Sequence, residues 1–245
     1  MPIPVEICVN SLNPDYVYRS VAAAYEGGAA RIELCGDMSV GGITPTMTAL
    51  EAAREAFRDR RGLLCMIRPR GGYFSYGNEE VLLMEQQICD AARAGADGVV
   101  IGTLALPGNT INRDVLGQLV DTAKTRNLSV TFHRALDATP NMFESLDVLI
   151  QYGVDRILSS GTTWGSADGA SEGVRMLAQL MLKAENKLEL VVGGGVSPEN
   201  IGKILQQLPV ENHATSIHAY SSVLETGEVS VERVRSLCSA VESFH

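Results

Sequence analysis

One pattern recurs along the whole sequence: a short apolar run, then a polar loop, then an amphipathic segment. A short apolar run between polar loops is typical of a strand that is buried on both faces, as in a parallel sheet. There are eight such runs, and no change in composition separates them. They predict strands over residues 5–9, 31–35, 63–68, 98–102, 129–133, 155–159, 188–192 and 215–218.

The amphipathic segments predict a helix after each strand. Asn13 followed by Pro14, and Ser197 followed by Pro198, are typical of a capped helix start. The expected helices cover 14–26, 46–60, 79–94, 112–126, 140–151, 172–184, a stretch from 198 onward, and 230–242. Eight strand–helix units in 245 residues predict a single-domain (β/α)8 barrel of the TIM type, which usually has about 250 residues. An open doubly wound sheet is the alternative, but the glycines at 193–195 do not form its G-x-G-x-x-G fingerprint.

The third predicted strand brings two arginines to its carboxyl end. Pro69 has no N–H for a sheet ladder, so the strand is expected to stop near Arg68. Arg68 and Arg70 lie two positions apart, so their side chains are expected to leave the strand on the same side unless the turn has already begun there. Ligands of a parallel barrel bind at this edge, and guanidinium groups bind phosphate or carboxylate through paired hydrogen bonds. The stretch therefore predicts a site for a small anionic ligand.

Acidic side chains alternate with apolar ones on the first two strands. This alternation places Glu6 with Cys8, and Glu33 with Cys35, on the face that lines the barrel. A buried charge needs a partner, because an isolated one is very costly. The expected partners of the two glutamates are Arg68, Arg70, His133 and Arg134. Two interpretations stay open: an ion network that fills the barrel, or glutamates that bind a ligand.

The two cysteines of these strands have comparable positions near the strand ends. Neighbouring strands lie about 4.8 Å apart, so the sulfurs of Cys8 and Cys35 could share one soft ion, and Cu(I) prefers thiolates. The alternative is that they pack as buried, apolar-like residues. The sequence has five cysteines and no Cys-x-x-Cys pair, which favours reduced thiols in a cytosol over a disulfide framework.

More polar residues follow the fifth and eighth strands. His133 and Asp137 could transfer protons, and Arg134 between them could bind an anion. His218 ends the eighth strand and is a second histidine at the same rim, although a single histidine there is more often structural. Each of these residues lies where the loops of a barrel form its site.

The glycines at 193–195, centred on Gly194, precede the start of a predicted helix. Helix N-termini bind anions, and barrel phosphate sites commonly follow the seventh and eighth strands. A phosphate cradle and a simple tight turn are both consistent with the pattern. Trp164, in the Gly/Ser-rich loop over 159–170, is expected to cover either a ligand or the rim.

Composition bears on the partners. The net charge of −9 and the absence of a basic cluster argue against nucleic acid. No apolar run approaches the ~20 residues of a membrane-spanning helix. The first residues carry no basic stretch before an apolar one, so no signal peptide is expected.

At these residues the sequence resembles the CutC family of copper homeostasis proteins. The most specific matching motifs are Met-Ile-Arg-Pro-Arg-Gly-Gly at 66–72 and Thr-Phe-His-Arg-Ala at 131–135. Other matches are Glu-Ile-Cys at 6–8, Gly-Ala-Ala-Arg-Ile-Glu-Leu-Cys at 28–35, Gly-Gly-Ile-Thr-Pro at 41–45, Gly-Ala-Asp-Gly at 95–98, Leu-Ser-Ser-Gly at 158–161 and Gly-Gly-Gly at 193–195. The resemblance implies an (α/β)8 barrel, a cytoplasmic location, a homodimer and a role in copper handling, with Cys8 and Cys35 as the copper ligands.

Two classes of function are therefore open. The first is a copper homeostasis protein that binds Cu(I) through two cysteines at the barrel mouth. The second is a barrel enzyme acting on a small phosphorylated or carboxylated metabolite, with His133 and Asp137 as the proton-transfer groups. The residues expected to bind ligand are Glu6, Glu33, Arg68, Arg70, Arg134, Gly194 and His218.

Overall fold

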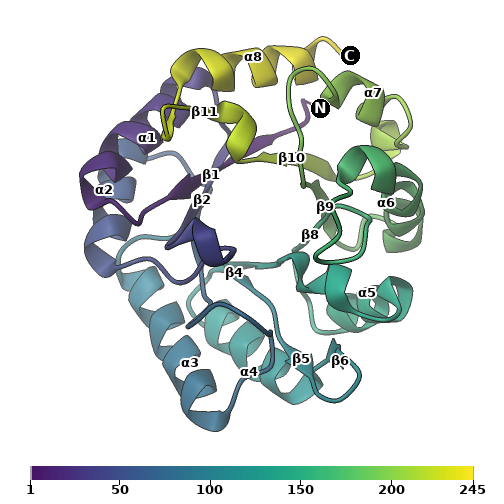
Figure 1. The fold of residues 1–245 in the computed structure, drawn as a ribbon. Helices are drawn as coiled ribbons and strands as arrows, with labels where there is room; N and C mark the ends of the chain where they lie inside the picture. Colours follow the sequence, from purple (N-terminus) through teal and green to yellow (C-terminus); the bar gives the residue numbers. More distant parts are fainter. Residues whose placement is uncertain (1, 245) are drawn as a thin grey trace.

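Eight parallel strands close into a barrel, and helices surround it (Figure 1). The structure, a computed structural model, describes residues 2–244. Going around the barrel, each strand pairs with the next, and the last pairs with the first. The strands are β1 (Val5–Asn10), β2 (Arg31–Cys35), β3 (Leu63–Met66), β4 (Gly98–Ile101), β7 (Ser129–Phe132), β8 (Arg156–Ser159), β9 (Glu189–Val192) and β10 (Thr215–Ala219). The predicted (β/α)8 barrel is confirmed.

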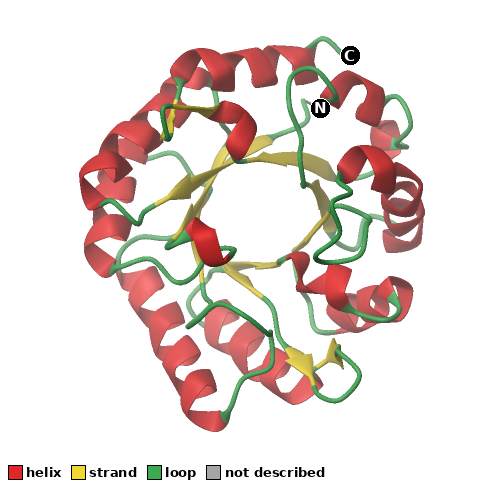
Figure 2. Cartoon of the chain, in the orientation of Figure 1, coloured by secondary structure: helices red, strands yellow, loops and turns green. Residues whose placement is uncertain are grey.

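The helices form an outer ring (Figure 2). They are α1 (Pro14–Gly27), α2 (Met47–Phe57), α3 (Asn78–Arg93), α4 (Arg113–Lys124), α5 (Met142–Gln151), α6 (Ala170–Ala184), α7 (Ile201–Leu205) and α8 (Val231–Glu242). The predicted cap of α1 is present, because the side chain of Asn13 accepts the Asp15 N–H. Helix α7 starts later than Ser197 and Pro198 predicted, because the Asn200 side chain accepts the Ser197 N–H and holds a turn there.

Short elements lie in the loops that connect the barrel strands with the helices. The 3₁₀ turns are η1 (Met38–Val40), η2 (Arg134–Ala138), η3 (Val210–Asn212) and η4 (Ser221–Val223). Two small hairpins lie outside the barrel: β5 (Leu104–Ala105) with β6 (Thr110–Ile111), and β11 (Leu224–Glu225) with β12 (Glu228–Val229). Strand β3 ends at Met66, two residues before the predicted end, because the Arg68 N–H donates to the Thr44 hydroxyl rather than to a neighbouring strand.

Strand side chains alternate between two environments. On β1, Ile7 and Val9 belong to the main apolar core beneath the helices, whereas Cys8 packs in a separate small cluster inside the barrel. Leu64 and Met66 of β3 belong to the same inner cluster. The outward positions are apolar because helices cover them, so the polar strand residues face inward, as the alternation predicts.

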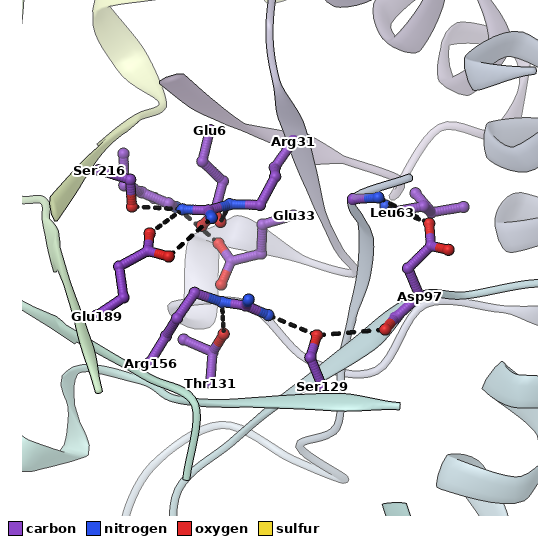
Figure 3. Close-up of polar contacts among 12 residues, drawn as sticks. Glu6, Arg31, Glu33, Leu63, Asp97, Ser129, Thr131, Arg156, Glu189 and Ser216 are labelled. Carbon is purple, nitrogen blue, oxygen red and sulfur yellow. Dashed lines mark hydrogen bonds and ion pairs between the residues drawn. The ribbon is translucent and has the colours of Figure 1, made fainter. Parts of the chain in front are cut away.

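An ion network fills the amino end of the barrel (Figure 3). The Arg31 guanidinium donates from Nε to Glu6 Oε2 at 2.9 Å and from Nη2 to Glu189 Oε1 at 2.6 Å. Burial lowers the pKa of Arg31, but Glu6 and Glu189 outweigh it, so the pKa is raised overall. Glu6 therefore pairs with Arg31, which lies opposite it in the strand register, and the predicted pairing with an arginine or histidine of the rim was wrong.

Arg156 lies beside this pair and has a different set of partners. It donates to the hydroxyls of Thr131 at 2.9 Å and Ser129 at 2.6 Å, both on β7. Burial and the neighbouring Arg31 lower its pKa. Arg31, Arg156 and Glu189 are each the first residue of a strand, so the network lies at the end of the barrel opposite the loops that carry the site.

None of the helices within residues 2–244 has the length and the apolar composition of a membrane-spanning segment.

Candidate binding site at the barrel mouth

A cavity of about 270 Å³ opens at the carboxyl ends of the strands. Cys35 and Ala219, the last residues of β2 and β10, both line it. Its polar lining includes Glu33, Arg68, His133, Arg134 and His218, and its apolar lining includes Met66, Phe74, Leu158, Trp164 and Val196. A mostly apolar cavity with a few convergent polar groups is typical of a small-molecule site.

Three sulfur atoms lie together at the base of this cavity. The Sγ atoms of Cys8 and Cys35 are 3.8 Å apart, and the Cys8 Sγ is also 3.8 Å from the Sδ of Met38. Met38 begins η1, in the loop directly after β2. The hydrogen bond with Cys8 raises the pKa of the Cys35 thiol well above its usual value, and burial adds to this. The Cys35 thiol is therefore protonated at neutral pH when no metal competes.

An ion pair lies beside the sulfurs. His218 Nε2 is 2.8 Å from Glu33 Oε2, so the partner of Glu33 is His218 and not an arginine. Burial alone would raise the pKa of the Glu33 carboxyl, but His218 outweighs it and the pKa is lowered. Burial would lower the pKa of His218, but Glu33 raises it well above its usual value. One donor atom each of Cys8, Glu33 and His218 lies within 4.8 Å of the others.

Arg68 points into the barrel and is 2% exposed. Its guanidinium donates to three backbone carbonyls: Val40 at 2.9 Å, Gly42 at 2.8 Å and Gly72 at 2.9 Å. It also lies over the Phe74 ring. Among residues 2–244, no carboxylate forms an ion pair with it. A buried cation without a counter-charge is costly, so Arg68 leaves an unbalanced positive charge in the cavity wall.

Arg70 leaves the chain in another direction from Arg68, which is the alternative expected if the turn has already begun. Its Nε is 2.6 Å from Glu80 Oε1, and its other nitrogens donate to the carbonyls of Tyr73 and Ser75. It is not among the residues that line the cavity. The chain has already turned at Pro69 to Gly72, which ends the alternation of a strand.

The His133 ring is uncharged. Its Nδ1 accepts the Ala135 N–H at 3.0 Å, so the proton of the neutral ring lies on Nε2. Burial, with the charge of Arg68, lowers the pKa of His133 to about 3. The buried Nε2 has no hydrogen-bond partner among the residues that the structure describes. A Cβ at Gly102 would overlap the ring, so the glycine there makes room for it. His133 is thus a hydrogen-bond donor rather than a cation.

Asp137 is buried and its carboxylate is fully engaged. It accepts from Arg134 Nε at 2.8 Å, from the Ser159 hydroxyl at 2.5 Å and from the Ser160 hydroxyl at 2.9 Å. Arg134 also donates to the Ser160 hydroxyl at 2.7 Å and lies over the Trp164 ring. Asp137 therefore fixes the position of the Arg134 side chain, and the Asp137 carboxylate does not line the cavity.

The structure thus separates the predicted site residues into two groups. Those that line the mouth cavity are Glu33, Cys35, Arg68, His133, Arg134, Gly194 and His218. Cys8 lies beneath it, Asp137 behind Arg134, Arg70 outside it and Glu6 at the opposite end. Met38, Phe74 and Tyr220 line the cavity without having been predicted. Met38 follows Cys35 by three residues, and that short spacing is the only hint that the sequence offers.

Known proteins resemble this chain over most of its length. The model of the CutC family matches residues 3–219, which is most of the chain. The chain belongs to the CutC family. A CutC family protein of Bacteroides fragilis is 38% identical over 221 residues, covering 90% of this chain and 82% of the relative. The mouse copper homeostasis protein cutC homolog is 37% identical over 202 residues, covering 82% of this chain and 69% of the relative.

A solved structure of the family has the same fold. The CutC protein of Streptococcus agalactiae superimposes with a TM-score of 0.77 at 30% identity, covering 88% of this chain and 98% of that one. The CutC match ends at residue 219, so it includes every residue of the sulfur cluster and its histidine.

Proposed function

We propose that this CutC family member binds one Cu(I) ion through Cys8 and Cys35 and serves in copper homeostasis. The observation that carries the proposal is the 3.8 Å separation of the two sulfurs at the base of the mouth cavity. Thiolate and thioether sulfurs are the ligands that Cu(I) prefers. The name of the mouse relative, a copper homeostasis protein, supports the same reading.

The other donors nearby suit the same soft ion. Met38 supplies a thioether 3.8 Å from Cys8, and His218 supplies an imidazole. Glu33 holds the His218 ring through its hydrogen bond, as second partners of metal-binding histidines usually do. Cys35 and His218 line the cavity, so an ion can reach them from the mouth.

Replacing both Cys8 and Cys35 with serine is expected to weaken Cu(I) binding by at least about tenfold, because both preferred sulfur ligands are lost. The measurement is an anaerobic Cu(I) titration against a competing chelator. Cys89→Ser is the matched control, since Cys89 lies on α3 away from the cluster. Equal affinity in the wild type and the double variant would remove these cysteines from the account of copper.

A second function is favoured by one further observation, the buried charge of Arg68. We propose, as the alternative, that the protein is a barrel enzyme. Its mouth cavity would bind a small phosphorylated or carboxylated metabolite, which is its substrate. The anion would supply the counter-charge that Arg68 lacks. His133 would donate a hydrogen bond from Nε2 to the same ligand, and the Glu33–His218 pair would be the proton-transfer group nearby.

Arg68→Met is expected to weaken the binding of small carboxylates by at least about tenfold, because charge-assisted hydrogen bonds are lost. Thermal shift with a series of hydroxy and oxo acids would measure it. Arg70→Met is the matched control, because the same change is then made in an arginine outside the cavity. A loss of the same size in both variants would exclude a specific role for Arg68.

Location and assembly complete the proposal. We propose a cytoplasmic homodimer, as the family resemblance implies. All five cysteines are free thiols, which is consistent with a reducing compartment. The molar mass in solution, measured by light scattering, would test the dimer.

A further inference from the structure

We infer that the backbone at Gly194, Gly195 and Val196, together with Arg134, forms a phosphoryl-binding subsite, and that its ligand is a small phosphorylated carboxylic acid whose carboxylate reaches Arg68. This inference rests on the second function proposed above and specifies the ligand of that site.

The subsite begins with three consecutive N–H groups that have no acceptor. The N–H of Gly193 donates to Ser159 and that of Ser197 to the Asn200 side chain. Between them, the N–H groups of Gly194, Gly195 and Val196 donate to nothing within residues 2–244. All three residues line the cavity; Val196 is 2% exposed, Gly194 is half-buried and Gly195 is exposed. A buried N–H such as that of Val196 is rarely left unpaired, and concave runs of successive N–H groups bind anions.

The glycines are needed for this backbone path. Gly194 has a φ of +102° and Gly195 a φ of +71°, which other residues adopt at a cost. A Cβ at Gly194 would also lie 2.8 Å from the Cβ of Ser160. The backbone therefore approaches this part of the rim more closely than a chain with side chains could.

Arg134 lies beside the same backbone. Its Cζ and Nη1 would be 3.7 Å from a Cβ at Gly194. Asp137 holds its Nε and Ser160 holds its Nη2, while its Nη1 has no hydrogen-bond partner within residues 2–244. The Trp164 ring fixes the remaining face of the guanidinium. An arginine already held in place loses little freedom on binding, so its Nη1 is a prepared donor for a phosphoryl oxygen.

The other end of the ligand is indicated by Arg68 and His133. Both line the same cavity. In the described part of the chain, neither Nε of Arg68 nor Nε2 of His133, both buried, meets the criteria for a hydrogen bond. Both nitrogens are donors, and only Arg68 carries a charge, so an oxygen acceptor with one negative charge fits them best. A carboxylate meets that description.

The size and charge of the cavity limit the ligand further. A volume of about 270 Å³ admits a small metabolite and is at the low end for ligand sites. Glu33 is paired with His218, and Asp137 with Arg134, so Arg68 is the charge left unbalanced among the residues described. A phosphate at the N–H groups and a carboxylate at Arg68 would satisfy both ends within one small molecule.

The test uses four probes and one pair of variants. The probes are inorganic phosphate, 3-phosphoglycerate, glycerate and glycerol 3-phosphate, with binding measured by calorimetry on the full chain. The variants are Gly195→Asp and Gly195→Asn, which have the same shape. A side chain at Gly195 meets no atom within 4 Å, and both residues tolerate its positive φ better than most. They differ by one negative charge next to the N–H groups.

We expect 3-phosphoglycerate to bind more tightly than any of the other three probes. Gly195→Asp is expected to weaken binding of 3-phosphoglycerate and glycerol 3-phosphate at least about tenfold through charge repulsion, and to leave glycerate nearly unchanged. Gly195→Asn carries the same change of backbone and the same side-chain shape without the charge, so the charge effect is the difference in affinity between the two variants. A loss of equal size in both variants would contradict the charge effect.

Two outcomes separate this inference from the function on which it rests. If glycerate and 3-phosphoglycerate bind equally well, and Gly195→Asp changes neither, the phosphoryl subsite is overturned while an anion site at Arg68 stands. If none of the four probes binds the wild type, the subsite and the anionic-metabolite function are both overturned.

Discussion

Replacing Arg31 with methionine is expected to lower the free energy of unfolding by about 3–5 kcal/mol, which would be a large part of the stability of such a chain. Arg31 is the cation that bridges Glu6 and Glu189, and the Glu6 side chain is 1% exposed. Without it, two carboxylates stay in the barrel interior with no ion-pair partner of their own. Urea unfolding at neutral pH, followed by circular dichroism, would measure the loss.

An exposed ion pair supplies the control. Arg19 pairs with Glu228 on the surface, where the two side chains are 60% and 32% exposed. Arg19→Met is expected to cost about 1 kcal/mol or less. Adding Glu6→Gln to the Arg31→Met variant is expected to restore part of the stability, because it removes one of the uncompensated charges. If Arg31→Met costs no more than Arg19→Met, the network does not hold the barrel together.

His133 is expected to make the protein less stable as the pH falls from 6 to 5, with a slope that approaches about 1.4 kcal/mol per pH unit. The folded protein keeps this ring neutral down to a pKa of about 3, whereas the unfolded chain takes up a proton near the usual value of 6.5. Between those values the unfolded state binds the extra proton, so acid favours unfolding. Urea midpoints across this pH range would measure the slope.

His218 and Glu33, which lie near His133, contribute little to the change in stability between pH 6 and pH 5. The pKa of His218 is raised, so its contribution is fully present below 6.5 and is lost only as the pH rises through the raised value. The pKa of Glu33 is lowered from 4.5, so its contribution is lost only at more acidic pH. His133→Asn keeps an acceptor for the Ala135 N–H without an imidazole. A slope as steep in this variant as in the wild type would rule out His133 as its source.

The barrel could be predicted from the sequence because a period of two and a repeating strand–helix unit are local signals. The same alternation placed Glu6, Cys8, Glu33 and Cys35 inside the barrel, and the two sulfurs do meet. Alternation says which way a side chain points, but not how far along the barrel it lies. Glu6 lies opposite Arg31 in the register, well below the arginines of the rim, so its partner could not be chosen from face alone.

The conformations of the loops could not be predicted from the alternation of side chains either. Arg68 and Arg70 follow the strand rule only while the chain is a strand, and β3 has already ended at Met66. The position of Met38 depends on the 3₁₀ turn after β2, which the Asp37 side chain starts by accepting the Ser39 N–H. Neither conformation is visible as a period in the sequence. The residues that strands carry could be predicted better than those that loops carry.

The ion network closes the amino end of the barrel. Arg31 and Arg156 occupy the lower interior, the sulfurs of Cys8 and Cys35 lie above them, and the mouth cavity lies above the sulfurs. An ion held by the sulfurs would enter and leave by the mouth, through the space that a small ligand would occupy. The ligand that binds last would therefore have to dissociate first. A ligand in the mouth would block the path of the ion, so the residence time of the ion would depend on the affinity of that ligand.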